Sequence, residues 1–349
     1  MDNEENEARR DGFASGAPNE GMTSPTFRNL TTVLSFAALG AICACAARVQ
    51  DLGGEPGGVA AGDDGGSDGG QPIFGGDVGG ACTLSNRWIA FDSDRDAFNR
   101  NVFIARADGT DVRRLTNDPA VEREPSFSPD GRHVAFASDL DGTMQIYVLD
   151  VVTHAKVKVS ARTEAASRPS FSFDGSKIVF SSGGLLYLAN PDGSGDRLFA
   201  TPPSPQGLLQ SLTQPTFLPN GSVLAPQANG LALVEPDGTN KLLYNAYPPK
   251  YAAVTLDGRT MALADEYSCH DVIIAAIQPL LPCAGRRLGD SAIDEVAFGP
   301  DNALAVTKGN PGDIFVAQTS CRVTNDPADD RSPSWAPVGF QGAESVPIR

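Results

Sequence analysis

Short apolar runs alternate with polar turns along most of the chain after residue 82. Runs such as Val102–Ile104 and Ile146–Val148 are three or four residues long, and Asp-Gly pairs such as Asp192-Gly193 follow several of them. An Asp-Gly pair between two short apolar runs is a strong signal for a β-hairpin. No long stretch in this region has apolar residues at helical spacing, so the pattern predicts an all-β protein with little helix.

The pattern is also periodic. Six units end in an Asp-Gly-like turn, and successive units are separated by 37 to 46 residues. The units are Pro125–Gly131, Pro169–Gly175, Pro215–Gly221, Ala252–Gly258, Val296–Asn302 and Pro333–Gly339. Periods near 40 residues are typical of propeller blades or solenoids. Each unit has room for four short antiparallel strands, which is the content of one propeller blade.

One position on the first strand of every unit carries a bulky side chain. The residues at this position are Phe127, Phe171, Phe217, Val254, Phe298 and Trp335. Adjacent blades of a propeller pack face to face, and burying one such side chain is worth about 1.5–3 kcal/mol. We therefore expect these six residues to fill the wedges between blades.

The two ends of the repeat region predict how the ring closes. Trp88–Phe91 matches the second strand of a unit, whereas the last unit stops after its first strand at Trp335. The sequence Thr116–Ala120 recurs letter for letter as Thr324–Ala328, each time before a first strand. We expect three N-terminal strands and the C-terminal strand to share one blade, which removes both free sheet edges. The prediction is a six-bladed β-propeller.

The units resemble the propeller repeats of the TolB family and related WD-like propellers. The likeness is carried by Leu115–Asn117, Pro125–Gly131, Ala135–Asp139 and Ile146-Tyr147, and it covers roughly residues 85–340. It implies protein–protein contact at the cell envelope, with a partner such as a peptidoglycan-associated lipoprotein, and no reaction. TolB itself has an α/β domain ahead of its propeller, in the place that a Gly-rich segment takes in this chain.

The N-terminal part has the order of an export signal. A segment with Arg28 precedes the apolar run Leu30–Ile42, which is too short for a comfortable membrane span, and small residues and Cys45 follow. We interpret residues 1–45 as an extension and a lipoprotein-type signal, with translation starting at Met22 and lipid attached to Cys45. The alternative is an ordinary soluble export signal. With lipid, the expected location is the outer membrane.

Composition refines this picture. Residues 46–81 are rich in Gly and Asp and predict a flexible linker, so the folded domain is expected over 82–349. The formal net charge of −16 repels phosphate backbones, which argues against a nucleic-acid partner. We expect a monomer, exported to the periplasm or the cell surface, that contacts the membrane only through its lipid.

Catalytic motifs are weak. The histidines His133, His154 and His270 fall in three different repeats, and the G-x-S-x-G string at residues 65–69 lies in the linker, without the strand and helix that a nucleophile elbow needs. We therefore predict a binding module and no enzyme. The alternatives are a propeller lyase or hydrolase with residues lining the channel, and a calcium-binding structural lipoprotein.

Calcium is the one cofactor that the sequence suggests. Asp92, Asp94 and Asp96 begin like a calcium loop, and Asp139 and Asp141 lie at a similar place in the next repeat. An EF-hand needs Gly at its sixth position and Glu at its twelfth, and here residues 97 and 103 are Ala and Phe. Two interpretations remain: the Asp side chains shape the loops through backbone N–H groups, or they bind calcium.

Four cysteines follow the signal, and they allow three disulfide connectivities. They are Cys82, Cys269, Cys283 and Cys321. Cys82–Cys321 would reinforce the ring closure and is the favoured pair, although a partner for Cys269 does not emerge. For recognition we expect the face that carries the loops between second and third strands and between blades, of which Thr201–Thr213 is the longest.

Overall fold

The computed structural model describes residues 84–96, 99–201, 212–227, 230–244, 249–264, 272–277, 286–287, 293–317, 319 and 321–343. All of them lie in the second of two units into which the chain divides, Glu55–Arg349. The predicted signal, Cys45 and the Gly-rich linker lie outside the described residues, as do Cys82, Cys269, Cys283 and most of the loop after Thr201.

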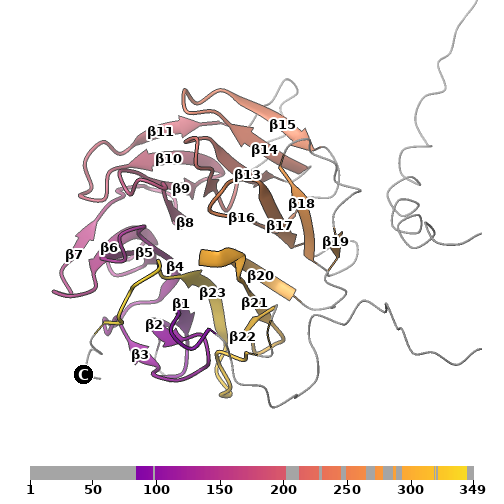
Figure 1. The fold of residues 1–349 in the computed structure, drawn as a ribbon. Coiled ribbons are helices and arrows are strands. Elements are labelled where there is room, and N and C mark those ends of the chain that lie inside the picture. The colour runs from indigo at the N-terminus through magenta and orange to yellow at the C-terminus, as the bar shows by residue number, and fades with distance from the viewer. Residues whose placement is uncertain are drawn as a thin grey trace, which may run out of the picture. The chain divides into compact units, whose positions relative to one another are not determined.

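Six antiparallel sheets form a ring of blades around a central axis (Figure 1). In order from the axis outward, the first blade consists of β23 (Asp330–Trp335), β1 (Trp88–Ser93), β2 (Asn101–Arg106) and β3 (Arg113–Arg114). The second consists of β4 (Glu122–Phe127), β5 (His133–Ser138), β6 (Gln145–Asp150) and β7 (Lys156–Lys158). The third consists of β8 (Ala166–Phe171), β9 (Ile178–Ser182), β10 (Leu185–Ala189) and β11 (Arg197–Ala200).

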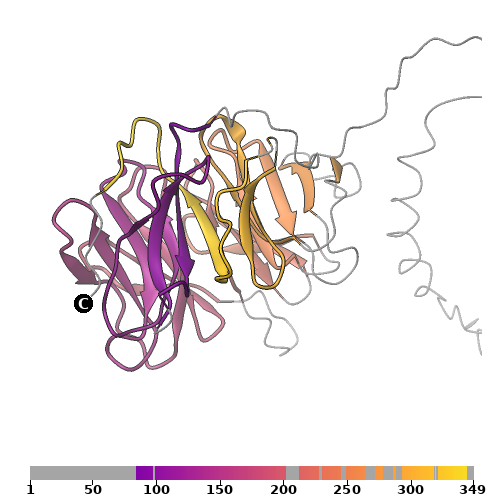
Figure 2. The same cartoon turned by 90° about the horizontal axis from the view of Figure 1, so that it is seen from below.

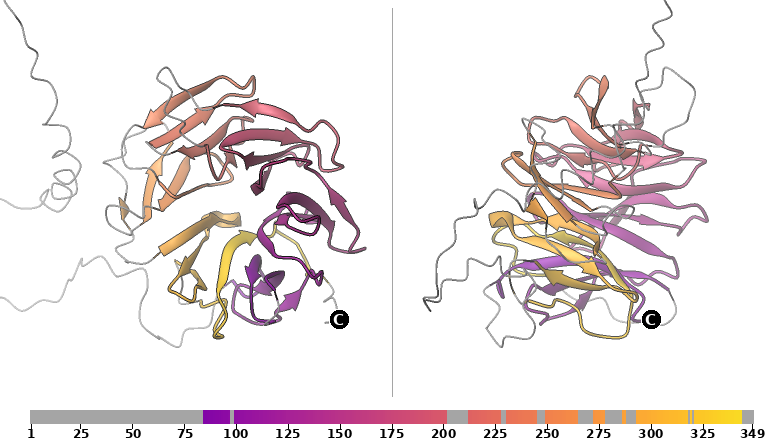
Figure 3. Two further views of the ribbon diagram at one scale, coloured as in Figure 1. Left: turned by 180° about the vertical axis from the view of Figure 1, so that it is seen from behind. Right: turned by 90° about the vertical axis from the view of Figure 1, so that its right-hand side faces the viewer.

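The remaining three blades complete the ring (Figure 3). The fourth consists of β12 (Thr216–Phe217), β13 (Val223–Gln227), β14 (Gly230–Val234) and β15 (Asn240–Tyr244). The fifth consists of β16 (Tyr251–Val254), β17 (Thr260–Ala264), β18 (Val272–Ala276) and β19 (Arg286–Arg287). The sixth consists of β20 (Ile293–Phe298), β21 (Leu304–Lys308) and β22 (Asp313–Val316).

The predicted ring closure is confirmed. Strand β23 pairs antiparallel with β1, with Ile89 opposite Trp335, so both ends of the repeat region share the first blade. Figure 2 shows the C-terminal strand lying beside the N-terminal strands. The pairing ties residues that are far apart in sequence into one sheet, and it covers the axis-side edge of β1, which would otherwise be free.

The prediction of four strands in every unit is wrong for the sixth blade. Within the described residues this sheet has three strands, and the expected fourth is reduced to one bridge between Phe315 and Arg322. The backbone of Cys321, Val323 and Thr324 still bonds to β22. The segment thus lies along β22 as a fourth strand would, but its ladder is reduced to a single residue pair.

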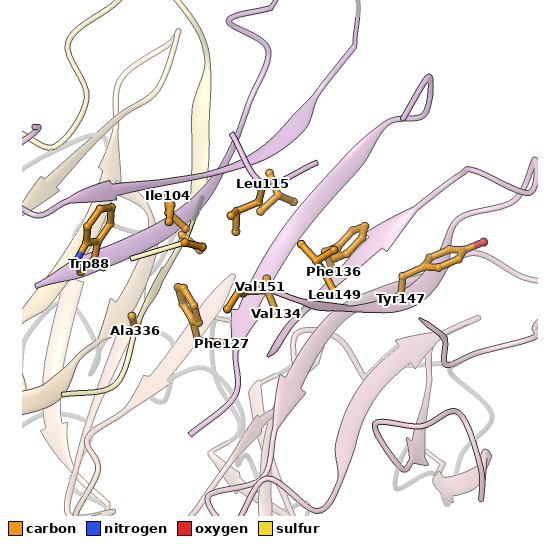
Figure 4. Packing of buried hydrophobic residues seen from close by; sticks show 13 residues of the cluster. Trp88, Ile104, Leu115, Phe127, Val134, Phe136, Tyr147, Leu149, Val151 and Ala336 are labelled. Carbon is orange, nitrogen blue, oxygen red and sulfur yellow. The ribbon is translucent and has the colours of Figure 1, made fainter. Parts of the chain in front are cut away.

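The core consists of clusters between adjacent blades. Phe127 of the second blade packs with Trp88 and Ile104 of the first (Figure 4), and Trp335 packs with Ala305 and Ile314 of the sixth. The predicted wedge residues are 5–8% exposed, apart from Phe298, which is partly buried. A bulky residue at one repeated position thus fills each interface between blades, as the sequence predicts.

Helix is nearly absent from the described residues. One 3-10 turn at Pro300–Asn302 replaces the Asp-Gly turn of the sixth blade. None of the helical structure in the described part of the chain has the length and hydrophobicity that crossing a bilayer requires.

Candidate functional site

A cavity of about 270 Å³ lies on the axis of the ring and is lined by residues of all six innermost strands, β4, β8, β12, β16, β20 and β23. Its lining falls into two layers. The aromatic layer consists of the wedge residues near the ends of these strands: Phe127, Phe171, Phe217, Phe298 and Trp335. The polar layer lies earlier on the same strands and consists of Glu124, Arg168, Tyr251, Glu295 and Ser332.

A local backbone feature places several polar residues on the axis. Glu124, Arg168, Gln214 and Ser332 have φ between 47° and 60°, in the left-handed region, and each immediately precedes a proline. In β4, β8 and β23 the strand register shifts at this point. Such bulges re-aim side chains, and residues in sparsely populated conformations cluster at functional sites.

Carboxylates of neighbouring blades hold these strained residues in place. The N–H of Glu124 donates to Asp92 (3.0 Å), and the N–H of Arg168 donates to Glu124 (2.7 Å). Across the ring closure, the N–H of Ser332 donates to Glu295. A buried backbone donor must find an acceptor, so each carboxylate fixes the polar residue of the next blade.

Arg168 is the centre of the polar layer. Its guanidinium lies 2.7 Å from a carboxylate oxygen of Glu124 and 3.3 Å from one of Glu295. It also donates to the hydroxyl of Tyr251 (2.8 Å) and lies 4.7 Å from the centroid of that ring. The Tyr251 hydroxyl in turn donates to Glu295 (2.7 Å), which also accepts from Thr307 (3.2 Å). One cation is thus enclosed by two carboxylates and an aromatic ring.

Charge states in this layer follow from these contacts. Burial would raise the pKa of Glu295, but the Arg168 charge, the Tyr251 hydroxyl and the Ser332 N–H together lower it below its ordinary value. Burial and the neighbouring Glu295 charge raise the pKa of Tyr251. Glu295 therefore stays ionised and Tyr251 stays neutral near pH 7.

The mouth of the cavity lies at the end of the blades that carries the Asp-Gly turns, which we call the turn side. Leu256, in the turn after β16, lines the cavity and is 57% exposed. Phe173, in the turn after β8, also lines it and is half-buried. The turn-side mouth is therefore apolar.

A second cavity, of about 910 Å³, lies at the opposite end of the blades, which carries the β1–β2 loop and the connections between blades and which we call the loop side. Its lining includes Asp94, Arg95, Arg100, Arg123, Asp326 and Pro327. The two cavities share no lining residue. The predicted recognition face thus carries a charged hollow, whereas the axial cavity opens on the other face.

The first three predicted calcium ligands do not converge on one point. Asp92 is 2% exposed and pairs with Arg100 (2.5 Å). Asp94 accepts the N–H of Asp329 (2.8 Å), and Asp96 pairs with Arg114 (3.1 Å). These carboxylates connect the β1–β2 loop to the strands and loops around it.

The other two predicted ligands also have protein partners. Asp139 accepts the N–H of Val121 (2.7 Å), and Asp141 accepts from Tyr147 (2.7 Å) and Lys158 (2.8 Å). In the part of the chain that the structure describes, no three His, Cys, Asp or Glu side chains are arranged to hold a metal ion. Calcium binding stays a prediction.

Cys321 is disulfide-bonded and lies in the cluster between the first and sixth blades, against which Leu84 packs. The cysteine that we favour as its partner, Cys82, lies two residues before Leu84 and outside the described residues. Of the histidines, His133 and His154 lie in the second blade's hairpins, away from the axis, and His270 lies outside the described residues.

Sequence reasoning missed the polar layer. Its signal was present, because a polar residue precedes the repeated proline in Glu124-Pro125, Arg168-Pro169, Gln214-Pro215 and Ser332-Pro333. In the sequence, these prolines indicated only the start of the repeated blade motif. Tyr251 and Glu295 stand in units that lack this proline, so no pattern in the sequence joined them to Arg168.

Comparisons with known proteins agree with the ring. Residues 85–243 match the family model of the TolB beta propeller domain. A crystal structure of TolB from Acinetobacter baumannii superposes with a TM-score of 0.59 at 20% identity, over 73% of this chain and 67% of that one. The crystal structure of a nidogen/laminin complex gives 0.56 at 12% identity, over 72% and 98%. The chain therefore carries a six-bladed β-propeller, and it is similar to the TolB propeller domain.

The matches to relatives in sequence cover a smaller part of this chain than the superposed structures do. A Protein TolB homolog from Chlorobaculum tepidum is 31% identical over 112 residues, which is 31% of this chain and 26% of that protein. The Tol-Pal system protein TolB of Bordetella pertussis is 43% identical over 44 residues, 13% of this chain and 10% of that protein. The chain thus matches about a quarter or less of the length of these relatives.

Proposed function

We propose that this chain is a non-catalytic, protein-binding propeller of the cell envelope, whose partner docks on the axial cavity. The observation that carries the proposal is the cavity itself, which combines an apolar mouth at Leu256 with an aromatic layer below it. Apolar clefts with a few convergent polar groups are the usual form of a binding site. The partner is expected to insert an apolar segment.

The polar layer supports binding over catalysis. A general base or acid needs a pKa near the working pH and a free position toward the substrate. Glu295 is held ionised by Arg168 and Ser332, and Tyr251 is held neutral, so neither group is poised to exchange a proton near pH 7. Arg168, Tyr251 and Glu295 bond to one another, as expected for the rigid wall of a binding site.

Location and partner class follow from the export signal and the relatives. The relative from Bordetella pertussis is a Tol-Pal system protein by name. The signal predicts a lipid on Cys45, with the flexible segment 46–81 between anchor and propeller. We therefore propose an outer-membrane lipoprotein that binds an envelope protein such as a peptidoglycan-associated lipoprotein. Membrane fractionation of Cys45→Ala tests the anchor, and release of this variant from the membrane is the expected result.

Capture from detergent-solubilised envelope tests the binding site. Leu256→Asp places a charge at the cavity mouth and should abolish capture of a specific partner. Leu198→Asp is the matched control, because Leu198 is also an exposed leucine (48%) but lies on the outer strand β11. Equal capture by both variants would refute docking on the cavity.

A further inference from the structure

Arg168 spans the ring. It starts on β8 of the third blade, whereas its partners belong to three other blades: Glu124 to the second, Tyr251 to the fifth and Glu295 to the sixth. In a ring of six, the third and sixth blades face each other across the axis. The Arg168–Glu295 contact of 3.3 Å is therefore a bridge across the channel, in addition to the contacts between neighbouring blades.

The linings of the two cavities indicate that the channel is closed between them. Arg168 lines the axial cavity at its polar end, and the hollow on the loop side shares no residue with that cavity. Three-quarters of the Arg168 side chain is covered, since its exposed fraction is 24%. The side chain thus lies where a through-channel would pass from one face to the other.

The backbone aims Arg168 at this position. Its φ of 56° is in the left-handed region, and Pro169 follows directly. Its N–H donates to the same Glu124 carboxylate that pairs with its guanidinium. Glu124 thereby fixes both ends of the residue, which is how a strained conformation persists in a folded protein.

We propose that Glu124, Tyr251 and Glu295 form a guanidinium-binding site across the channel, which Arg168 fills as a bolt that closes the channel midway. The closed channel has a consequence for binding, which rests on the proposed function: a partner reaches the axial cavity only through the turn-side mouth. The bolt itself does not depend on any partner.

Chemical rescue tests the bolt. Arg168→Ala leaves an empty site lined by two carboxylates and a phenol, so the variant should melt at a lower temperature than wild type. Methylguanidinium at low millimolar concentration should then raise its melting temperature by about 2–4 °C, since a ligand that binds only the folded state stabilises it. Wild type, with the site filled, should not respond.

Arg162→Ala is the matched control. The Arg162 side chain is 23% exposed, pairs with Asp196 and lies 4.0 Å from the centroid of the Tyr187 ring, but it is not on the axis. Rescue of Arg168→Ala alone, lost again when Glu295→Gln is added, supports the bolt. Equal responses of both alanine variants, or no response of folded Arg168→Ala, would overturn it.

If Arg168→Ala does not fold, Arg168→Lys combined with Tyr251→Phe in a double-mutant cycle replaces it. Coupled losses of stability support the contact of Arg168 with the fifth blade, which is one side of the guanidinium-binding site, and additive losses refute it.

The single entrance is tested separately by partner capture. Leu256→Asp, on the turn side, should lose the partner, whereas Arg123→Asp, which lines the loop-side hollow, should keep it. Loss with Arg123→Asp and not with Leu256→Asp would refute the single entrance. If no partner is captured at all while methylguanidinium rescue holds, the proposed function fails and the bolt stands.

Discussion

Glu122 makes the stability of this propeller depend on pH. The side chain is fully buried at the start of β4, 3.2 Å from Lys156, and one of its oxygens has no hydrogen-bond partner within the described residues. Lys156 also bonds to Asp118, so its charge is shared. Burial therefore outweighs the Lys156 charge and raises the pKa of Glu122 from 4.5 to about 7.

The sign follows from linkage. The folded protein holds the Glu122 proton more tightly than the unfolded chain does, so the free energy of unfolding falls as pH rises from 4.5 to 7. With these pKa values, the loss between pH 5.5 and pH 8 is about 2 kcal/mol. Burial likewise raises the pKa of Asp92 from 3.8 to about 6, which adds less than about 1 kcal/mol over the same interval.

Urea unfolding of the propeller at pH 5.5 and pH 8 measures this difference. Glu122→Gln imitates the protonated form, so we expect its free energy of unfolding to lose most of the dependence and to keep the part from Asp92 and from Asp330, whose pKa burial also raises. The control Glu164→Gln, at an exposed position before β8, should behave as wild type. An unchanged pH dependence in Glu122→Gln would refute burial as the cause.

The remaining predictions concern packing, turns and the disulfide. Phe127→Ala should cost about 3–5 kcal/mol in urea unfolding because it empties a wedge between blades, whereas Leu198→Ala on the surface should stay within about 0.5 kcal/mol; equal costs would contradict the wedge role. Gly258→Ala should lower the melting temperature more than Gly142→Ala. Both glycines have positive φ, but a Cβ at residue 258 would lie 2.6 Å from Pro219, whereas residue 142 has open space; the reverse order would contradict this steric account. Peptide mapping without reduction should link Cys321 to Cys82, and a Cys321 peptide joined to Cys283 or Cys269 would show the favoured pair to be wrong.

The ring could be predicted from sequence because one physical requirement repeats six times. Phe127, Phe171 and Trp335 fill equivalent wedges between different pairs of blades, and a glycine follows each of them at the same offset of four residues. The letter-for-letter repeat before β4 and β23 located the shared blade in the same way. Local patterns of this kind are written into every unit, so a single sequence shows them.

The axial site could not be predicted because its residues meet only in three dimensions. Arg168 and Glu295 are far apart in the chain, and neither follows a motif with a known chemistry. The acidic loop Asp92–Asp96 drew attention by its spacing, yet Arg100 and Arg114 take up two of its carboxylates. Spacing shows which residues are near in sequence, but charge pairing across blades decides what each one does.

Closure through β23 also sets an order of events for the chain in the cell. The first blade needs Trp335 beside Ile89, about 250 residues apart, so the blade that is made first is completed last. Until then the axis-side edge of β1 lacks its inner neighbour. A frameshift or early stop before residue 330 would therefore be expected to destroy the whole ring and not only its last blade.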